Sequence, residues 1–261
     1  MKMIDVHAHL HDSKFGEDRE ELIGRLQESD IFVVTIGTDL NESQKATHLA
    51  NSNENIWCTI GVHPCDDVDA TFDRKSFEQL ISEKVVAIGE CGLDYYRLDK
   101  VEDKEKEKER QRALFEQQII FACDYGLPLM LHGRPSQGSQ DAYEDMIKIL
   151  GKYNCFGNVH FFVGNVETAN KFLSLGFTFS LGGVMTITNE YNEMIKSLPL
   201  DSIHLETDSP YVAPKEHRGK RNSPEYLPII LKRLAELKDV DENTLLEQLN
   251  DNARRVFAIN F

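Results

Sequence analysis

Two histidines near the start of the chain, His7 and His9, have the residue type and spacing of a metal-binding pair. They end the segment Ile4-Asp5-Val6-His7-Ala8-His9-Leu10, in which a short apolar run leads into the two imidazoles. In an extended segment residues i and i+2 project to the same side, so both rings can reach one point beyond a strand. Because such a pair is also found among ordinary loop histidines, its meaning depends on what ends the other strands.

The same pattern, an apolar run that leads to an ionisable side chain, recurs along the chain. In barrels of alternating strands and helices, the active site forms where the carboxyl ends of the strands meet. Ionisable groups that converge there repel one another or lose solvation unless a cation holds them. Six of the eight apolar runs described below lead to such residues: His7 and His9; His63; Glu90; His132 with Arg134; His160; and Asp208.

Imidazoles mixed with carboxylates favour Zn, Mn, Fe or Mg over Ca, and this set is large enough for two ions. Two ions about 3.5–4 Å apart need a bridging group, and Glu90 on a middle strand can give one oxygen to each. Asp208, at the last strand beside the first, can bind the ion held by His7 and His9 and take a proton from water. Since a metal lowers the pKa of its bound water, the predicted reaction class is hydrolysis.

Eight apolar runs of strand length supply the elements that must position these residues. Their continuous Val, Ile, Leu and Phe content indicates strands buried on both faces, as in a parallel sheet covered by helices. The predicted strands are 3–6, 31–36, 56–60, 85–88, 127–131, 156–159, 177–181 and 202–205.

Helical patterns separate these runs. Asn165 is predicted to cap one helix and Gly176 to end it. The predicted helices are 20–28, 73–82, 104–125, 165–175, 224–237 and 243–256. The charges that begin the 104–125 segment alternate at i,i+3 and i,i+4, which favours a solvated helix surface over a nucleic-acid-binding tail. Eight alternations in 261 residues predict an α/β fold, a (β/α)₈ TIM-type barrel that forms a single domain over 1–261.

The formal net charge of −15 argues against a broad basic face for nucleic acid. Two divalent cations would nevertheless make one cleft locally positive. The five cysteines are odd in number and lack CxxC spacing, which indicates reduced thiols. The N-terminus has no apolar segment long enough for a signal peptide or membrane span. We therefore expect a cytoplasmic protein, monomeric and without membrane association.

Seven motifs spread over nearly the whole chain form a highly specific set: Asp5-Val6-His7-Ala8-His9-Leu10, Gly61-Val62-His63-Pro64, Ala87-Ile88-Gly89-Glu90-Cys91-Gly92-Leu93-Asp94-Tyr95-Tyr96, Leu131-His132-Gly133-Arg134, Val159-His160-Phe161, Glu206-Thr207-Asp208-Ser209-Pro210-Tyr211, and Arg218-Gly219-Lys220-Arg221-Asn222-Ser223-Pro224. With these motifs the chain resembles the TatD family of metal-dependent deoxyribonucleases, within the amidohydrolase-like barrels.

This resemblance implies a barrel with two divalent ions, for which we consider Mg, Mn or Zn. The ligands that it implies are His7, His9, Glu90 and Asp208 for one ion, and Glu90, His132 and His160 for the other. It also implies hydrolysis of phosphodiester bonds in DNA, with exonuclease action on single strands or DNA ends. His63 matches a family histidine near the scissile phosphate, and Arg134 a residue suited to binding it.

Two positions depart from the family pattern. Val163-Gly164 stands where the family usually has Ser-Gly, and His11 stands where an Asp often follows the first motif. The first change would remove a hydroxyl from the cleft, and the second would add an imidazole. Since neither touches an implied ligand, the departures bear on substrate preference.

Several other side chains have two interpretations each. Arg134 is interpreted as a phosphate anchor rather than a structural ion pair, because guanidinium matches phosphate in a planar, bidentate way. Glu206 is expected to orient a metal ligand or the loop rather than to bind a metal itself. Cys91 is expected to be a buried thiol rather than a ligand of a soft metal. Tyr95 and Tyr96 could stack a base or pack in the core. The remaining basic residues either rim the cleft or form a solvated loop: Lys215, His217, Arg218, Lys220 and Arg221.

Two other functions compete with a nuclease. The same barrel and metals would also suit a hydrolase of amides, esters or small phosphoesters, because fold and metals alone do not fix the substrate. A non-catalytic binding protein would be expected to have a broken ligand set, whereas this chain has all six proposed ligands.

Overall fold

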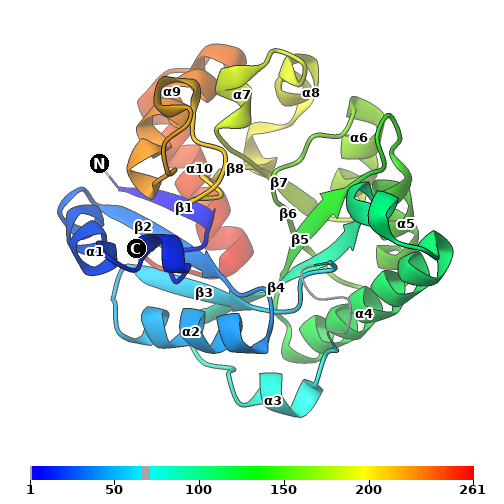
Figure 1. The fold of residues 1–261 in the computed structure, drawn as a ribbon. Coiled ribbons are helices and arrows are strands. Elements are labelled where there is room, and N and C mark those ends of the chain that lie inside the picture. Colours follow the sequence, from blue (N-terminus) through cyan, green and yellow to red (C-terminus); the bar gives the residue numbers. More distant parts are fainter. Residues whose placement is uncertain (1, 66–70) are drawn as a thin grey trace.

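The computed structural model describes residues 2–65 and 71–261. Its strands form one parallel sheet in the order β1 to β8, and each strand pairs with the next along the chain. The strands are β1 Met3–Ala8, β2 Ile31–Ile36, β3 Ile56–Ile60, β4 Val85–Asp94, β5 Leu129–Arg134, β6 Gly157–Val159, β7 Phe177–Leu181 and β8 Ile203–Leu205. The predicted (β/α)₈ TIM-type barrel is therefore confirmed, and helices surround its strands (Figure 1). That the whole chain is one domain stays a prediction.

The seam between β8 and β1 closes the barrel through a few specific hydrogen bonds. The amide of Asp208 donates to the carbonyl of His7 at 2.9 Å, and the amide of His9 donates to the carbonyl of Ser209 at 2.7 Å. The buried carboxyl group of Asp5 accepts from the amide of Thr207 at 3.0 Å and contacts the Thr207 hydroxyl. Burial raises the pKa of Asp5 to about 8, so this carboxyl group is mostly protonated at neutral pH.

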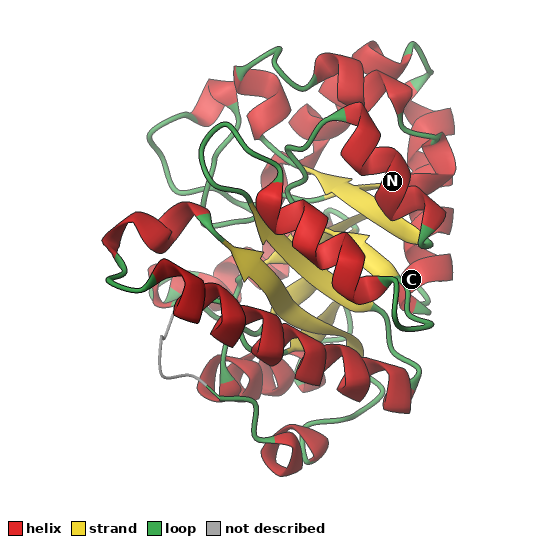
Figure 2. Cartoon of the chain, turned by 90° about the vertical axis from the view of Figure 1, so that its right-hand side faces the viewer, coloured by secondary structure: helices red, strands yellow, loops and turns green. Residues whose placement is uncertain are grey.

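Helices cover the outside of the strands (Figure 2). They are α1 Arg19–Glu28, α2 Leu40–Asn51, α3 Arg74–Glu78, α4 Lys104–Tyr125, α5 Asp141–Leu150, α6 Val166–Ser174, α7 Val184–Ile187, α8 Asn192–Ser197, α9 Leu227–Lys238 and α10 Glu242–Phe257. Short 3₁₀ turns are η1 Ser13–Phe15, η2 Tyr96–Lys100, η3 Leu200–Ser202, η4 Lys215–His217 and η5 Pro224–Tyr226. The sequence analysis named neither α2 nor α5, although α5 buries one apolar side.

Helix boundaries agree with the sequence patterns except at α3 and at the start of α9, where the turn η5 occupies the first three residues of the predicted helix 224–237. The side chain of Asn165 accepts from the amide of Thr168, and Gly176 follows α6 with a φ of +85°, as predicted for the cap and the end of this helix. The predicted helix 73–82 is too long, because α3 ends at Glu78. Leu80 and Ile81 pack against the core from the turn that leads into β4 instead.

β4 extends six residues beyond its predicted end, so Glu90 lies inside the strand and not after it. The pairing of β4 with β5 shifts register between Ile88 and Cys91, and Gly89 in this shift has a φ of +150°. A Cβ atom at Gly89 would lie 2.3 Å from the carbonyl oxygen of Met130. Only glycine fits this close approach, which places Glu90 at the mouth of the barrel.

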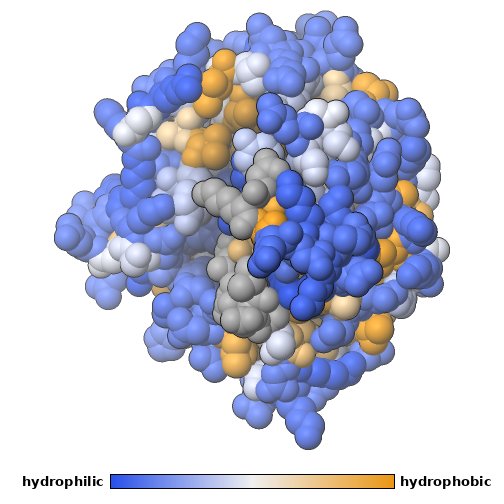
Figure 3. Space-filling view, turned by 45° about the vertical axis from the view of Figure 1, so that its right-hand side comes forward, coloured by the Kyte–Doolittle hydropathy of each residue, from blue (hydrophilic) through white to orange (hydrophobic). Residues whose placement is uncertain are grey.

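Two clusters of buried apolar side chains hold the fold together. The larger cluster packs the helices against the strands. The smaller one joins alternate strand residues, such as Ile4 with Val6 and Val34 with Ile36, to Val256 and the end of α10. The face in Figure 3 is mainly hydrophilic, with small separate groups of hydrophobic residues. Among the described residues, we find no helix with the length and apolar character needed to cross a membrane.

His204 on β8 is a buried polar group away from the strand ends. Its Nε2 lies 2.9 Å from the hydroxyl oxygen of Thr178, and its ring packs near Phe257. Burial lowers the pKa of His204 to about 3, and the charge of Arg255 adds to this effect. The imidazole is therefore neutral in the folded protein at neutral pH.

Replacing His204 by Gln should weaken the pH dependence of stability. Because the folded pKa lies below the ordinary value of 6.5, the unfolded chain binds more protons between pH 6.5 and 3, so stability falls as pH falls through this window. Between pH 7 and 5.5, wild type should lose about 1 kcal/mol more unfolding free energy than His204→Gln. Urea unfolding at both pH values measures this difference, and equal losses in the two proteins would contradict it.

Candidate metal centre

The predicted site residues meet at one end of the barrel, in a cleft of about 930 Å³. They come from the ends of six strands or from the loops that follow them, with His7 and His9 from β1 and His132 and Arg134 from β5. His7 is fully buried beneath the cleft floor. The other predicted residues all line the cleft: His9, His63, Glu90, His132, Arg134, His160 and Asp208.

The carboxylate of Glu90 lies at the centre of two groups of imidazoles. Its Oε2 is 3.5 Å from His7 Nε2 and 3.8 Å from His9 Nε2. Its Oε1 is 2.8 Å from both His132 Nδ1 and His160 Nε2. Each oxygen of Glu90 therefore faces a different group, the arrangement that a bridging ligand needs.

Asp208 completes the group on the Oε2 side. Its Oδ1 lies 3.5 Å from His9 Nε2 and 3.7 Å from His7 Nε2. Its φ of +54° turns the chain just after β8. The structure thus brings together, in two groups, the six residues for which the sequence predicts metal binding.

Further contacts orient His9 and His132. His9 Nδ1 lies 3.2 Å from the carbonyl of Ile36, and His132 Nε2 lies 3.3 Å from Asp94 Oδ2. A hydrogen bond at one ring nitrogen fixes the tautomer and leaves the other nitrogen free for a ligand. The sequence analysis did not single out Asp94, although its position four residues after Glu90 in an extended strand places both on one face.

Glu206 lies beside the imidazole of His160, and its role in orienting a ligand stays a prediction. Its Oε1 lies 3.8 Å from His160 Nδ1 and accepts a hydrogen bond from the amide of Phe161 at 2.8 Å. Its Oε2 accepts from the hydroxyl of Ser180. Glu206 is fully buried, so it can fix the position of His160 without reaching the solvent-filled cleft.

The charges of the site are strongly coupled. Burial by itself raises the pKa of Glu90, but the charge of His160 and hydrogen bonds from the surrounding imidazoles outweigh it, so the pKa lies well below its ordinary value. Burial lowers the pKa of His160, yet Glu90 and Glu206 hold it well above the ordinary value. The pKa of His7 is lowered, first by burial and then by the charge of His160.

Unpartnered nitrogens show that this donor set fits a cation. Both ring nitrogens of His7 and Nδ1 of His160 are buried and have no hydrogen-bond partner among the described residues. Neutral imidazole nitrogens and carboxylate oxygens are common ligands of divalent metals. Within the described part of the chain, three groups have ligand atoms close enough for one ion: His7, His9 and Glu90; His63, Glu90 and His132; and His7, His160 and Glu206.

His63 lies beside the second group of imidazoles. Its Nε2 is 3.8 Å from Glu90 Oε1, and its ring centroid is 4.4 Å from that of His132. On its other side, Nδ1 lies 3.4 Å from the amide of Cys65, whose thiol is 3.5 Å from Asp94 Oδ2. The sequence analysis assigned no role to Cys65, because its proximity to Asp94 depends on the pairing of β3 with β4.

Arg134 ends β5 at the cleft wall, with its guanidinium 4.0 Å above the ring of Tyr96. Among the described residues it makes no ion pair with a carboxylate, and its interpretation as a phosphate anchor stays a prediction. Tyr96 is 46% exposed and lines the cleft, whereas Tyr95 is buried and donates to Asp145. Cys91 is a buried thiol, as expected.

The two departures from the family pattern both lie on the cleft wall. His11 Nε2 is 3.2 Å from Glu42 Oε2, and Val163 lines the cleft near Phe161. The basic residues 215–221 are not among the described residues that line the cleft. Within that segment, Arg221 pairs with Asp18, which favours the loop interpretation at this position.

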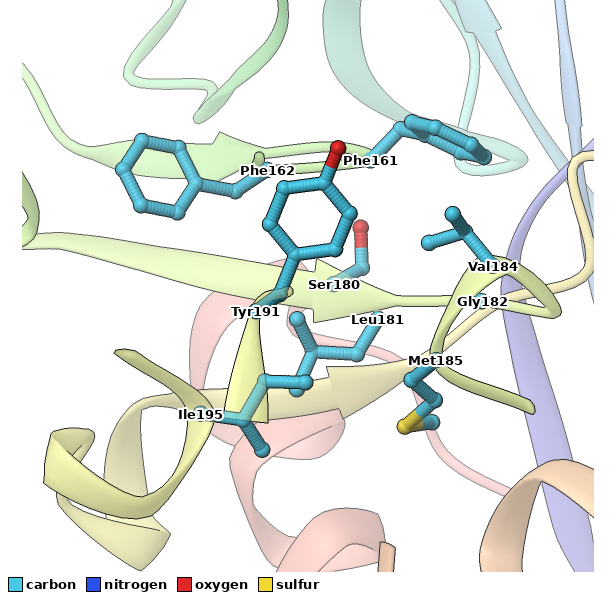
Figure 4. Close-up of a pocket in the computed structure, with 9 residues that line it drawn as sticks. All are labelled: Phe161, Phe162, Ser180, Leu181, Gly182, Val184, Met185, Tyr191 and Ile195. Atoms are coloured by element: carbon cyan, nitrogen blue, oxygen red, sulfur yellow. The ribbon is translucent and has the colours of Figure 1, made fainter. Parts of the chain in front are cut away.

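A second, smaller cavity lies behind Phe161 (Figure 4). Its volume is about 10 Å³, which holds about one water molecule and excludes a nucleotide. Phe161 and Phe162 point in opposite directions from their strand end, and Phe161 has a φ of +47°. This turn places the Phe161 ring in the cleft wall and the Phe162 ring in the core.

The sequence model of the family described as TatD-related DNase matches residues 4–258 of this chain. The chain belongs to this family. The family assignment from the sequence motifs is therefore confirmed, and this TatD-family chain is a hydrolase.

Relatives of known sequence and structure cover nearly the whole TatD-family chain. The metal-dependent hydrolase YabD of Bacillus subtilis is 35% identical over 99% of this chain and 100% of its own. The 3′-5′ ssDNA/RNA exonuclease TatD of Pectobacterium parmentieri is 32% identical over 98% of this chain and 100% of its own. The crystal structure of the TatD homologue YjjV from Escherichia coli K12 superposes with a TM-score of 0.87 at 26% identity, covering 99% of this chain and 98% of that one.

Replacing Glu206 by Ala should destabilise the protein more than replacing it by Gln. The alanine leaves the Phe161 amide and the Ser180 hydroxyl without their buried acceptor, which should lower the unfolding free energy by about 2–3 kcal/mol. Glutamine keeps an oxygen for the amide and should cost less than about 1 kcal/mol. Urea unfolding in the presence of a chelator measures both changes. Equal losses would mean that these hydrogen bonds contribute little.

Proposed function

We propose that this chain hydrolyses phosphodiester bonds at the ends of single-stranded nucleic acid, DNA in the first place, by means of two divalent metal ions. The observation that carries the proposal is the position of Glu90, whose two oxygens face separate groups of imidazoles. Relatives named 3′-5′ ssDNA/RNA exonuclease align with nearly the whole chain and support the choice of substrate.

In this proposal the two groups hold one ion each. The first ion is assigned to His7, His9, Glu90 and Asp208, and the second to Glu90, His132 and His160. The distances around Glu90 support this division, and Mg, Mn or Zn are the candidate ions. When bound, such ions supply a Lewis acid and lower the pKa of a water molecule that attacks phosphorus.

The chain's own groups have distinct roles. Glu90 holds the two groups in a fixed relation. Asp208 is ionised, because hydrogen bonding to His9 and the charges of the surrounding imidazoles outweigh the effect of burial and lower its pKa. Its Oδ1 can therefore take a proton from the attacking water. His63 at the cleft wall contacts the scissile phosphate, and Arg134 binds phosphate through its planar guanidinium.

Metal content and activity should depend on each other. Protein purified without chelator should contain a divalent metal by elemental analysis and should shorten a labelled single-stranded oligonucleotide. A chelator should stop the reaction, and Mg, Mn or Zn should restore it. Faster hydrolysis of ester or amide substrates than of the oligonucleotide and bis-p-nitrophenyl phosphate would favour the alternative hydrolase.

Replacing Glu90 or Asp208 by Ala should reduce hydrolysis by on the order of 10³-fold or more, because each loses a metal ligand and Asp208 also a proton acceptor. Both variants should remain folded by circular dichroism, since large core side chains are untouched. Glu167→Ala, an exposed carboxylate on α6, is the matched control and should keep wild-type activity. Near-normal turnover of either site variant would refute the mechanism.

Replacing Arg134 by Ala should raise KM for an oligonucleotide roughly 10- to 100-fold, because a charge-assisted contact to phosphate is lost. Metal content should stay at the wild-type level, since Arg134 contacts none of the proposed ligands. Arg134→Lys should recover only part of the loss, because an ammonium lacks the planar fork. Loss of metal with unchanged KM would reverse the role assigned to Arg134.

A further inference from the structure

Among the described residues that line the cleft, the charged side chains other than Glu90 and Asp208 are divided between its two sides. Arg97 in η2 follows β4, and Arg134 ends β5. Asp12 follows β1, Glu42 in α2 follows β2, and Glu190 follows β7. We call the first pair the basic side and the three carboxylates the acidic side.

The strand order places Arg134 and Asp12 on opposite strands of the barrel. The sheet runs from β1 to β8, and β8 closes on β1 through the hydrogen bonds of His7 and His9. In a closed barrel of eight strands, β5 lies opposite β1 and β4 lies opposite β8. Arg134 and Asp12 therefore come from opposite strands of the barrel and line the same cleft, and so do Glu90 and Asp208.

On the basic side, the guanidinium of Arg134 is positioned to bind an anion. The guanidinium of Arg134 stacks on Tyr96 at 4.0 Å and has no carboxylate partner among the described residues. Arg97 lies farther along the same wall, with its Nε 3.6 Å from Asp94 Oδ2. A nucleic acid strand, with a phosphate on every nucleotide, is attracted to this side.

The acidic side combines carboxylates with an exposed aromatic ring. Tyr211 is 43% exposed, lines the cleft, and donates a hydrogen bond from its hydroxyl to Asp12 Oδ2 at 3.1 Å. Its ring centroid lies 5.8 Å from that of His9, so it borders the metal centre. Lys14 stacks on this ring and Lys45 pairs with Glu42, but neither ammonium is among the described residues that line the cleft.

A phosphate and a sugar hydroxyl behave in opposite ways at such a wall. Carboxylates repel a phosphate, and the cost grows where burial reduces screening. The same oxygens accept a hydrogen bond from a sugar hydroxyl, because an ionised carboxylate is only an acceptor. An exposed tyrosine ring stacks any unpaired base, which leaves base identity open.

From this opposition we infer that the acidic side holds the terminal nucleoside of the strand, with its free hydroxyl at Asp12 and Glu42 and its base on Tyr211. The rest of the strand extends over Arg134. The two carboxylates thereby confine cleavage to the last phosphodiester of a strand whose end carries a hydroxyl and no phosphate. This inference rests on the proposed phosphodiester hydrolysis and adds the residues that select the strand end.

Four oligonucleotides of one sequence test the inference, with a hydroxyl or a phosphate at each of the two ends. A phosphate at the attacked end should lower kcat/KM of the wild-type enzyme at least tenfold, and a phosphate at the other end should leave it unchanged. Equal rates on all four oligonucleotides would overturn the inference.

Variants that each remove one negative charge test the roles assigned to Asp12 and Glu42. Asp12→Asn keeps an oxygen for the Lys14 amide, and Glu42→Gln keeps the size of the side chain. In each variant, the ratio of kcat/KM for an attacked end that carries a hydroxyl to kcat/KM for one that carries a phosphate should fall at least threefold. Activity on the hydroxyl end should change by less. Glu167→Gln, an exposed carboxylate outside the cleft, should discriminate as wild type does. Unchanged discrimination in both cleft variants would overturn the assignment.

Binding measurements distinguish a failure of this inference from a failure of the proposed function. If wild type hydrolyses none of the four oligonucleotides with Mg, Mn or Zn, the proposed function fails. Fluorescence anisotropy in the presence of a chelator then decides the inference without turnover. A phosphate at one end should weaken binding at least tenfold in wild type and less in Asp12→Asn, and equal binding of all four would overturn it.

Discussion

The structure depends on the convergence of buried ionisable side chains at one mouth of the barrel. Four imidazoles and two carboxylates lie within a few ångströms of one another, and each is buried or only slightly exposed. Such a group is costly unless opposite charges or a cation offset the lost solvation. Pairing among the residues offsets only part of it, because within the described ranges His7 keeps two unpartnered nitrogens. The site is therefore built for positive charge that the chain itself does not supply.

The barrel holds three of the imidazoles in position through contacts on the side of the ring away from the proposed metal centre. Asp94 holds His132, Glu206 lies behind His160, and the carbonyl of Ile36 orients His9. At the seam, the mostly protonated Asp5 joins β8 to β1 and so sets the distance between Asp208 and His7. These contacts restrict side-chain rotation, which keeps the free nitrogens directed at a common centre.

Local charge at the cleft differs from the charge of the whole molecule. The net charge of −15 disfavours broad attraction of nucleic acid, and the described cleft wall places its two arginines on one side. An acidic protein can still act on phosphates when cations and a few arginines are concentrated at one site. The carboxylates on the other side of the cleft make its electrostatic field asymmetric, so the cleft distinguishes one end of a bound strand from the other.

The sequence by itself determined the fold class, the eight strands and the residue types at their ends, because alternation along a strand and its apolar content are local properties. It also placed Glu90 between two sets of histidines. Only the tertiary structure decided which oxygen of Glu90 faces which imidazole, that Asp94 contacts His132, and that Asp12 and Arg134 line the same cleft from opposite strands. These relations depend on the register of neighbouring strands and on barrel closure, for example the shift at Gly89, and no local pattern encodes them.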